Sequence, residues 1–191
     1  MKSICVYCGS SAGTDPAFMD EAVRCGTLIA EQGLTLVYGG GRVGLMGAVA
    51  DAALAAGGRV TGVMPADLVK AEIAHTGLTE LRVVTSMHER KLAMADLSDG
   101  FVCLPGGPGT FEEAFEQWTW ALLGIHAKPC GFVNVSGYYD LMRQTIQQMA
   151  VAGFVGQAYV DMLIYADTTA DVLDAFRTYV APPPKWSGVK V

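Results

Sequence analysis

Residues 101–124, FVCLPGGPGTFEEAFEQWTWALLG, decide how this chain folds. The apolar run 101–104 predicts a buried strand, and Pro105 with the glycines that follow it predicts a tight loop. From Thr110 onward, apolar side chains recur at helical spacing on one side: Phe111, Ala114, Phe115, Trp118 and Leu122. Glycine lets the backbone approach an anion, and a helix start offers unpaired N–H groups, so this order of elements is typical of phosphate binding. It is not a Walker loop, because no Gly-Lys-Ser or Gly-Lys-Thr follows.

Two acidic residues, Glu112 and Glu113, follow the loop in what we expect to be the first helical turn. A carboxylate beside an anion site opposes anion binding, which makes Glu113 a candidate for chemistry. A structural role competes with this interpretation. Thr110-x-x-Glu113 has the spacing of a capping box, with Thr110 as N-cap and Glu113 reaching back to its N–H. The local sequence alone favours the cap over catalysis.

Length and composition predict one globular domain. The chain has 191 residues, of which 51% are hydrophobic and 17% charged, and its mean hydropathy is +0.32. We expect a single domain over residues 1–180 and an extended tail over 181–191, which begins APPPKW. No apolar run reaches the roughly 20 residues of a membrane span, and the N-terminus lacks the pattern of a signal peptide. The sequence therefore predicts a cytoplasmic protein with no membrane partner.

Charge and cysteine pattern exclude further classes of partner and site. A net charge of −6 and a pI near 4.9 argue against a nucleic-acid partner. Cys5-x-x-Cys8 lies in a strand-like run, where positions i and i+3 point to opposite faces, and the sequence has no second pair of this kind. The three histidines are scattered along the chain. We therefore expect buried free thiols and no metal site.

Strand-like and helix-like segments alternate along the chain. Nearly continuous apolar runs, typical of strands buried on both faces, occupy residues 4–8, 34–38, 59–64, 81–85, 101–104, 130–135 and 162–165. Helical segments cover residues 16–32, 45–56, 87–97, 111–123, 138–151 and 169–179. This alternation predicts an α/β fold, a doubly wound parallel sheet with helices on both faces, in which ligands bind at the carboxyl ends of the strands.

Three glycine-rich turns follow strands and so come to that edge of the sheet. They are CGSSAG at residues 8–13, YGGGRVGLMG at 38–47 and PGGPGT at 105–110. One such turn is easily explained as a surface loop, but three at one edge predict a pocket of nucleotide size. We expect its walls to include Gly9, Ser10, Gly40, Gly41 and Gly44.

The second turn matches the dinucleotide fingerprint in form, as Gly39-x-Gly41-x-x-Gly44. An NAD site also needs an acid near the end of the next strand to hold the ribose. That strand ends Gly62-Val63-Met64-Pro65, without an acid. The sequence therefore indicates a mononucleotide and not NAD.

A second capping box, Ser86-x-x-Glu89, opens the helix predicted at 87–97, and Arg90 and Lys91 follow it. Adjacent basic residues are often simply solvated. This helix follows a strand, however, so its start lies at the ligand edge, where Arg90 could pair with a phosphate or orient Glu113. Glu72 lies in a polar stretch between two predicted strands that is either solvated or folded over the pocket.

The motifs together resemble one known family. PGGPGTFEE at residues 105–113 matches the PGGxGTxxE motif of the Lonely Guy family, the cytokinin riboside 5'-monophosphate phosphoribohydrolases. The resemblance runs from Cys5 to about Ala175 and includes CGSS at 8–11, GGGRVGLMG at 39–47, MHERK at 87–91, LGIHAKP at 123–129, NVSGYY at 134–139 and GF at 153–154. Several motifs in the same order make it specific.

The resemblance implies a homodimer of Rossmann-like subunits with the active site close to the dimer interface. It implies that Arg90 and Glu113 are catalytic, which reverses the preference for the cap. The substrate-binding positions that it implies are Glu72, Met87, Lys91, Gly106, Gly107, Pro108, Gly109, Thr110 and Thr119. The chain departs from the family pattern at Pro108, which stiffens the loop and removes one N–H donor. We also expect the helix after the loop, with Trp118 in the core and apolar residues on a second face, to contribute to the interface.

The reaction implied is hydrolysis of the N-glycosidic bond of N6-prenylated AMP, or of AMP, to a free base and ribose 5-phosphate, without a metal or organic cofactor. The alternative is a non-catalytic carrier of a nucleotide or of molybdenum cofactor. A decarboxylase that uses pyridoxal phosphate is not expected, because Lys91, beside Arg90, is a poor candidate for the Schiff-base lysine.

Overall fold

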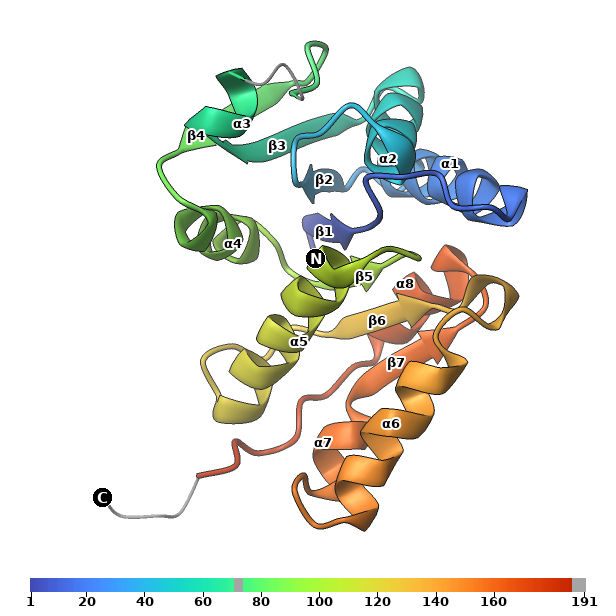
Figure 1. Cartoon of the computed structure of the whole chain (residues 1–191), viewed down its shortest axis with the longest axis vertical. Helices are drawn as coiled ribbons and strands as arrows, with labels where there is room; N and C mark the ends of the chain where they lie inside the picture. The colour runs from blue at the N-terminus through green and yellow to red at the C-terminus, as the bar shows by residue number, and fades with distance from the viewer. Residues whose placement is uncertain (71–73, 187–191) are drawn as a thin grey trace.

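The computed structural model describes residues 1–70 and 74–186. Within them the chain forms one parallel seven-stranded sheet in the order β4-β3-β2-β1-β5-β6-β7 (Figure 1). The strands are β1 (Ser3–Tyr7), β2 (Thr35–Tyr38), β3 (Arg59–Pro65), β4 (Glu80–Val84), β5 (Phe101–Cys103), β6 (Cys130–Val133) and β7 (Leu163–Ala166). Strand order reverses direction between β1 and β5, and ligands of such sheets bind at this switch point. The predicted doubly wound α/β fold is confirmed.

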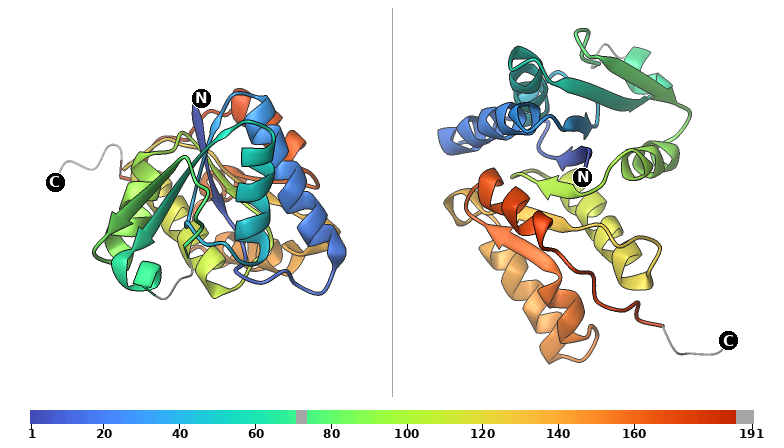
Figure 2. Two further views of the ribbon diagram at one scale, coloured as in Figure 1. Left: turned by 90° about the horizontal axis from the view of Figure 1, so that it is seen from above. Right: turned by 180° about the vertical axis from the view of Figure 1, so that it is seen from behind.

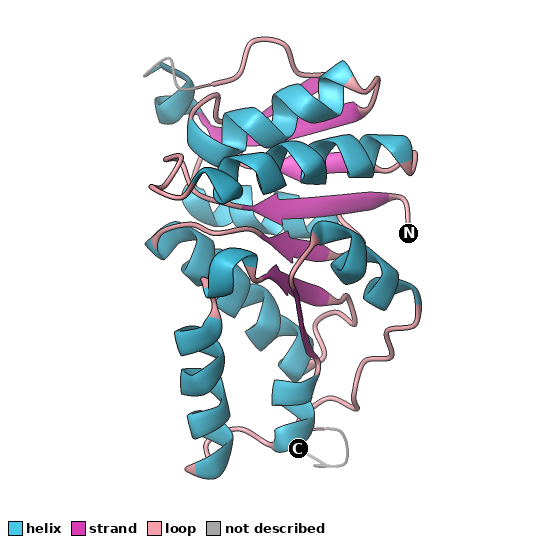
Figure 3. Cartoon of the chain, turned by 90° about the vertical axis from the view of Figure 1, so that its right-hand side faces the viewer, coloured by secondary structure: helices cyan, strands magenta, loops and turns pink. Residues whose placement is uncertain are grey.

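Helices cover both faces of the sheet (Figures 2 and 3). One buried cluster joins the sheet to α1 (Pro16–Glu31), α2 (Gly44–Ala55) and α8 (Thr169–Arg177). The other joins it to α4 (Met87–Asp96), α5 (Pro108–Leu123), α6 (Asp140–Val151) and α7 (Gln157–Asp161). The short helix α3 (Ala66–Lys70) and a 3-10 turn, η1 (Val135–Gly137), complete the described elements. No helix among them is long and apolar enough to cross a membrane.

All the segments predicted as strands and helices are present, but some boundaries differ. The helix predicted to start at residue 111 begins at Pro108, because proline fits the first helical position, where no N–H partner is needed. The five cysteines are free and buried, as expected. Trp118 packs in the core and donates its Nε1–H to the carbonyl oxygen of Tyr159 (2.7 Å).

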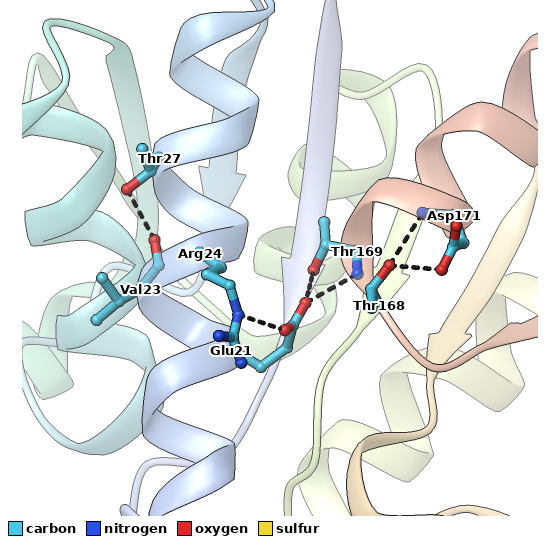
Figure 4. Close-up of polar contacts among 7 residues, drawn as sticks. All are labelled: Glu21, Val23, Arg24, Thr27, Thr168, Thr169 and Asp171. Atoms are coloured by element: carbon cyan, nitrogen blue, oxygen red, sulfur yellow. Dashed lines mark hydrogen bonds and ion pairs between the residues drawn. The ribbon is translucent and has the colours of Figure 1, made fainter.

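A buried carboxylate ties the first helix to the last. Glu21 of α1 is 3% exposed, and its Oε1 accepts hydrogen bonds from the N–H (2.8 Å) and hydroxyl (2.7 Å) of Thr169 at the start of α8. Its Oε2 accepts from Arg24 Nε (3.0 Å). Thr168 caps the same helix by accepting from the Asp171 N–H (Figure 4). The tie closes the face of the sheet that α1 and α8 share.

The described part of the tail, residues 181–186, forms no helix or strand but is not free of the domain. The Lys185 N–H donates to the carbonyl oxygen of Leu122 at the end of α5 (2.9 Å). The Tyr159 hydroxyl donates to the carbonyl oxygen of Pro183 (3.1 Å). The tail therefore lies against the ends of α5 and α7.

Candidate active site

A cavity of about 200 Å³ opens at the switch point of the sheet. The end of β1 and the loops after β1, β2 and β5 form its walls together with the first two turns of α5, and Arg90 of α4 and Met46 of α2 complete it. Of the predicted site residues it brings together Gly9, Ser10, Arg90, Gly107, Pro108, Gly109, Thr110 and Glu113. Two candidate catalytic residues and the phosphate loop thus share one cavity.

The third glycine-rich turn, which begins at Pro105, leads into α5 without any side-chain cap. Gly107 is the N-cap and makes no side-chain hydrogen bond. Pro108 has no N–H, and the N–H groups of Thr110 and Phe111 donate to the Gly107 carbonyl oxygen, so among the described residues the N–H of Gly109 is the first-turn donor left for a ligand. A Cβ at Gly106 would lie 2.1 Å from Thr110 Oγ1 and 2.7 Å from the backbone nitrogen of Gly9, so only glycine lets the first and third turns meet this closely.

The capping box predicted for Thr110 and Glu113 is wrong. Thr110 is buried and lies inside the first turn, and its N–H donates to the carbonyl oxygen of Gly107 (3.0 Å). Since α5 starts at Pro108, Glu113 lies in the second turn and not the first. Helix capping therefore does not explain the presence of Glu113 at this position.

Burial raises the pKa of Glu113 to about 7. This value is the net result: burial is the largest cause, the charges of Arg90 and Lys91 lower the pKa, and the neighbouring Glu112 and Glu116 raise it. A carboxyl group with a pKa near the working pH can exchange a proton or present a charge during a reaction. Glu113 is therefore suited to act as a base or as a counter-charge.

Arg90 reaches the cavity from the first turns of α4. Ser86 caps this helix by accepting from the Glu89 N–H (3.1 Å), as predicted, while the Glu89 carboxylate accepts from Thr85 instead of from Ser86. The Arg90 guanidinium donates to the carbonyl oxygens of Val63 (Nε, 3.0 Å) and Gly39 (Nη2, 2.8 Å). Within the described chain it forms no ion pair with Glu113, so the two side chains line the cavity separately.

Lys91 does not line this cavity. Its buried ammonium forms ion pairs with Glu112 and with Glu116 Oε1 (3.1 Å), both on α5. The hydrogen bond to Glu112 raises the pKa of Lys91 against the opposing effect of burial. A protonated lysine held in this way does not fit a Schiff base with pyridoxal phosphate, which needs a free amine. Sequence reasoning missed Glu116, although its spacing of four residues from Glu112 placed both on one helix face.

The remaining predicted site residues lie around the cavity. Gly44, with φ +57°, packs on the first turn, where a Cβ would lie 2.4 Å from the Ser10 backbone. Gly40 and Gly41 are buried beside the cavity, and the Met87 sulfur lies 3.9 Å from Arg90 Nη1. The exposed Thr119 donates to the Phe115 carbonyl oxygen (2.7 Å) and does not line the cavity. Glu72 lies outside the described residues.

A second cavity of about 360 Å³ adjoins the first and was not foreseen from the sequence. The two share Gly9, Ser10, Gly107 and Pro108 as walls. Its far side carries Phe18 and Tyr138, whose rings meet edge to face, and the Tyr138 hydroxyl donates to the Gly106 carbonyl oxygen (2.5 Å). Across both cavities and the rest of residues 1–70 and 74–186, no cluster of three or more His, Cys, Asp or Glu side chains could hold a metal ion.

Comparison with known proteins identifies relatives over almost the whole chain. A family model described as "Possible lysine decarboxylase" matches residues 46–176. A rice protein (Oryza sativa subsp. japonica) named as a probable cytokinin riboside 5'-monophosphate phosphoribohydrolase is 44% identical, with 100% of this chain and 77% of the relative covered. The cytokinin riboside 5'-monophosphate phosphoribohydrolase of Rhodococcoides fascians is 46% identical, with 93% and 90% covered.

Solved structures show the same fold at lower identity. The molybdenum cofactor binding protein of Rippkaea orientalis superposes with a TM-score of 0.72 at 21% identity, over 93% of this chain and 97% of that one. Such a likeness establishes the fold alone. The identity to the phosphoribohydrolases is twice as high, and residues of the PGGxGTxxE motif, Gly107 to Thr110 and Glu113, line the first cavity. The chain belongs to the Lonely Guy family of cytokinin riboside 5'-monophosphate phosphoribohydrolases.

Proposed function

We propose that this protein hydrolyses the N-glycosidic bond of N6-prenylated adenosine 5'-monophosphate, and of AMP, to release the base and ribose 5-phosphate. The observation that carries the proposal is the single cavity in which an uncapped helix start, Arg90 and Glu113 meet. Relatives at 41–46% identity that carry this activity in their names support the choice of substrate.

The glycine loop and the start of α5 supply the anchor. The N–H of Gly109 in the first turn and the positive end of the helix dipole attract the 5'-phosphate. Binding energy from the phosphate then orients the ribose for reaction, as remote binding energy does in other enzymes. Pro108 fits the first helical position without strain on the helix, but it supplies no N–H to this anchor.

Glu113 and Arg90 supply the chemistry. Cleavage of an N-glycosidic bond builds positive charge on the ribose ring, as in other glycosyl transfers. An ionised Glu113 would either stabilise that charge or take a proton from the attacking water. Water adds to C1' of the ribose, the base leaves with the bonding electron pair, and a proton returns to the base, so the reaction needs no co-reactant other than water.

The proposal includes a homodimer that completes the site. The first cavity, of about 200 Å³, is small beside the roughly 300–1,000 Å³ of most ligand pockets, so a prenylated nucleotide extends into the adjoining cavity of about 360 Å³ or against walls that a second copy supplies. Exposed apolar side chains on β4, on α4 and beyond α5, namely Val83, Met87, Leu92 and Ile125, are available to bury against a second copy.

The test is to incubate the purified protein with N6-isopentenyladenosine 5'-monophosphate and to quantify free base and ribose 5-phosphate by chromatography. Release of both in equal amounts supports the hydrolase. Tight binding without release would support a carrier instead. The matching nucleoside, which lacks the phosphate anchor, should be cleaved far more slowly; equal cleavage rates would contradict the proposed anchor. NAD should be neither bound tightly nor cleaved.

A further inference from the structure

Two backbone carbonyl groups hold the guanidinium of Arg90, the proposed catalytic arginine, where β2 ends beside β3. Strand β2 ends opposite Gly62 of β3, in the register Tyr38–Gly62, while β3 continues to Pro65. Gly39 and Val63 each follow one member of this last pair, and both residues are buried. Their carbonyl groups therefore lie just beyond the point where β2 and β3 stop pairing with each other. Arg90 donates to both of them, from Nη2 (2.8 Å) and Nε (3.0 Å). Buried carbonyl groups need partners, so the contact is favourable for the backbone and for the guanidinium alike.

From this contact we infer that Gly39 is a positioning residue for the reaction, because glycine alone leaves room for the Arg90 guanidinium. A Cβ at position 39 would lie 1.9 Å from Arg90 Nη2 and 3.1 Å from its Cζ. No such contact is possible, so any other residue must displace the guanidinium from the two carbonyl groups. The backbone of Gly39 itself does not require glycine, since its φ lies outside the left-handed region.

The contact also fixes which part of the guanidinium meets the substrate. The edge formed by Nε and Nη2 faces the carbonyl groups, while Nη1 has only the Met87 sulfur near it among the described residues, at 3.9 Å. Nη1 is therefore the nitrogen left to bind a phosphate or ribose oxygen or to face Glu113. A planar fork held along one edge loses little further entropy when the other side binds.

A lysine cannot reproduce this arrangement. Its single ammonium lacks the planar geometry that lets two donors on one edge reach two carbonyl groups. Arg90→Lys therefore keeps the positive charge at position 90 and removes the geometry that places it. The role inferred for Gly39 rests on the proposed function, because it takes Arg90 as a participant in catalysis.

The experiment measures steady-state hydrolysis of N6-isopentenyladenosine 5'-monophosphate by Gly39→Ala, Arg90→Ala, Arg90→Lys and the double variant Gly39→Ala/Arg90→Ala. We expect Gly39→Ala to lower kcat about 100-fold, the loss that an ångström-scale misplacement causes, with a smaller change in KM. The double variant should be no slower than Arg90→Ala, because both changes remove the same interaction. Arg90→Lys should lose activity to a similar extent despite its charge.

Gly156→Ala is the matched control. Gly156 is the N-cap of α7, with φ −69°, and its added Cβ would meet Tyr159 at an ordinary 3.4 Å. It lies outside both cavities at the switch point, so this variant should keep the parent kcat. Melting temperatures of all variants show whether they are folded at the assay temperature.

Chemical rescue adds a measurement that a purely structural role would not affect. Guanidinium at a non-denaturing concentration should restore part of the activity of Arg90→Ala, by occupying the vacated place, and none of the activity of the double variant. A fully active Gly39→Ala or Arg90→Lys, or a double variant slowed by the full product of both factors, would overturn the inference about Gly39. An active Arg90→Ala would instead overturn the proposed role of Arg90.

Discussion

At the scale of single residues, Glu113 distinguishes catalysis from structure. The helix start is formed by Pro108 and needs no contribution from Glu113. Glu113→Gln keeps the shape of the side chain and removes its charge. We therefore expect kcat to fall by about 100-fold or more, in the range of lost acid–base or electrostatic catalysis. Turnover is measured with the prenylated nucleotide at saturating concentration.

The control for this variant is Glu31→Gln, at the exposed end of α1. The adjacent acid, Glu112, is exposed, but it pairs with Lys91 and therefore cannot serve as a silent control. Near-normal turnover by a folded Glu113→Gln protein would remove Glu113 from the mechanism.

The raised pKa of Glu113 also predicts a pH-dependent effect on stability. Its ordinary value is 4.5 and its folded value is about 7, so the folded state binds more protons than the unfolded state between these pH values. This group therefore lowers stability progressively as pH rises from about 4.5 to 7, and by a constant amount above 7. Glu113→Gln should melt like the parent at pH 4 and at a higher temperature at pH 8. Calorimetry at both pH values checks this, and equal melting temperatures at pH 8 would show that burial does not perturb the carboxyl group.

At the scale of elements, Lys91 joins the two helices that carry the proposed catalytic residues, Arg90 and Glu113. It extends from α4, next to Arg90, to Glu112 and Glu116 of α5, on either side of Glu113. Lys91→Met keeps the length of the side chain and removes the charge. The variant should lose about 2 kcal/mol of stability, the scale of hydrogen bonds to a charged group.

The same variant should move the pH profile in a known direction. The charge of Lys91 lowers the pKa of Glu113, so its removal should raise that pKa and shift the acidic limb of kcat/KM to higher pH. An unchanged limb would show that Lys91 acts on stability alone. Lys70→Met, which removes an exposed lysine of α3, is the matched control and should change neither quantity.

Elements were predicted from the sequence more successfully than contacts between them. Buried parallel strands are nearly continuous apolar runs, so each strand could be recognised by itself. The five-residue helices α3 and α7 were missed, because so short a segment shows no helical period. The start of α5 was misplaced, since Pro108 and Gly109 have low helix propensity in general and are acceptable only at its first positions.

The candidate site was predictable only where one segment carries its own chemistry. The glycine turns and Glu113 are recognisable locally, and strand order brings them together. Two contacts gave no local signal: Lys91 with Glu116, and Arg90 with Gly39, which are 51 residues apart. Such pairings follow from the register of strands and helices, which a pattern of hydrophobicity does not encode at the level of individual side chains.

At the scale of the whole molecule, the proposed dimer links assembly to activity. The sequence predicts a contribution to the interface from a second apolar face of α5, which includes Trp120. In the structure Trp120 packs partly buried against the core and lies edge-on to His126. Among the exposed apolar side chains, Val83 (53% exposed) of β4, Leu92 (49%) of α4 and Ile125 (64%), just beyond α5, come from the elements beside the cavity. This surface therefore adjoins α4 and α5, the helices that present Arg90 and Glu113 to the cavity.

Leu92→Glu and Ile125→Glu should therefore weaken the dimer and the activity together. Each places a charge where apolar contact is expected, at little cost to a monomer in which the position is exposed. Light scattering at micromolar concentration should give twice the chain mass of 20.2 kDa for the parent and a shift toward the single mass for the variants. Leu141→Glu, at a 75% exposed position of α6, is the control and should leave both mass and turnover unchanged. Activity lost on dilution and regained on concentration would tie the site to assembly, whereas a fully active parent of 20.2 kDa would show that one subunit holds the complete site.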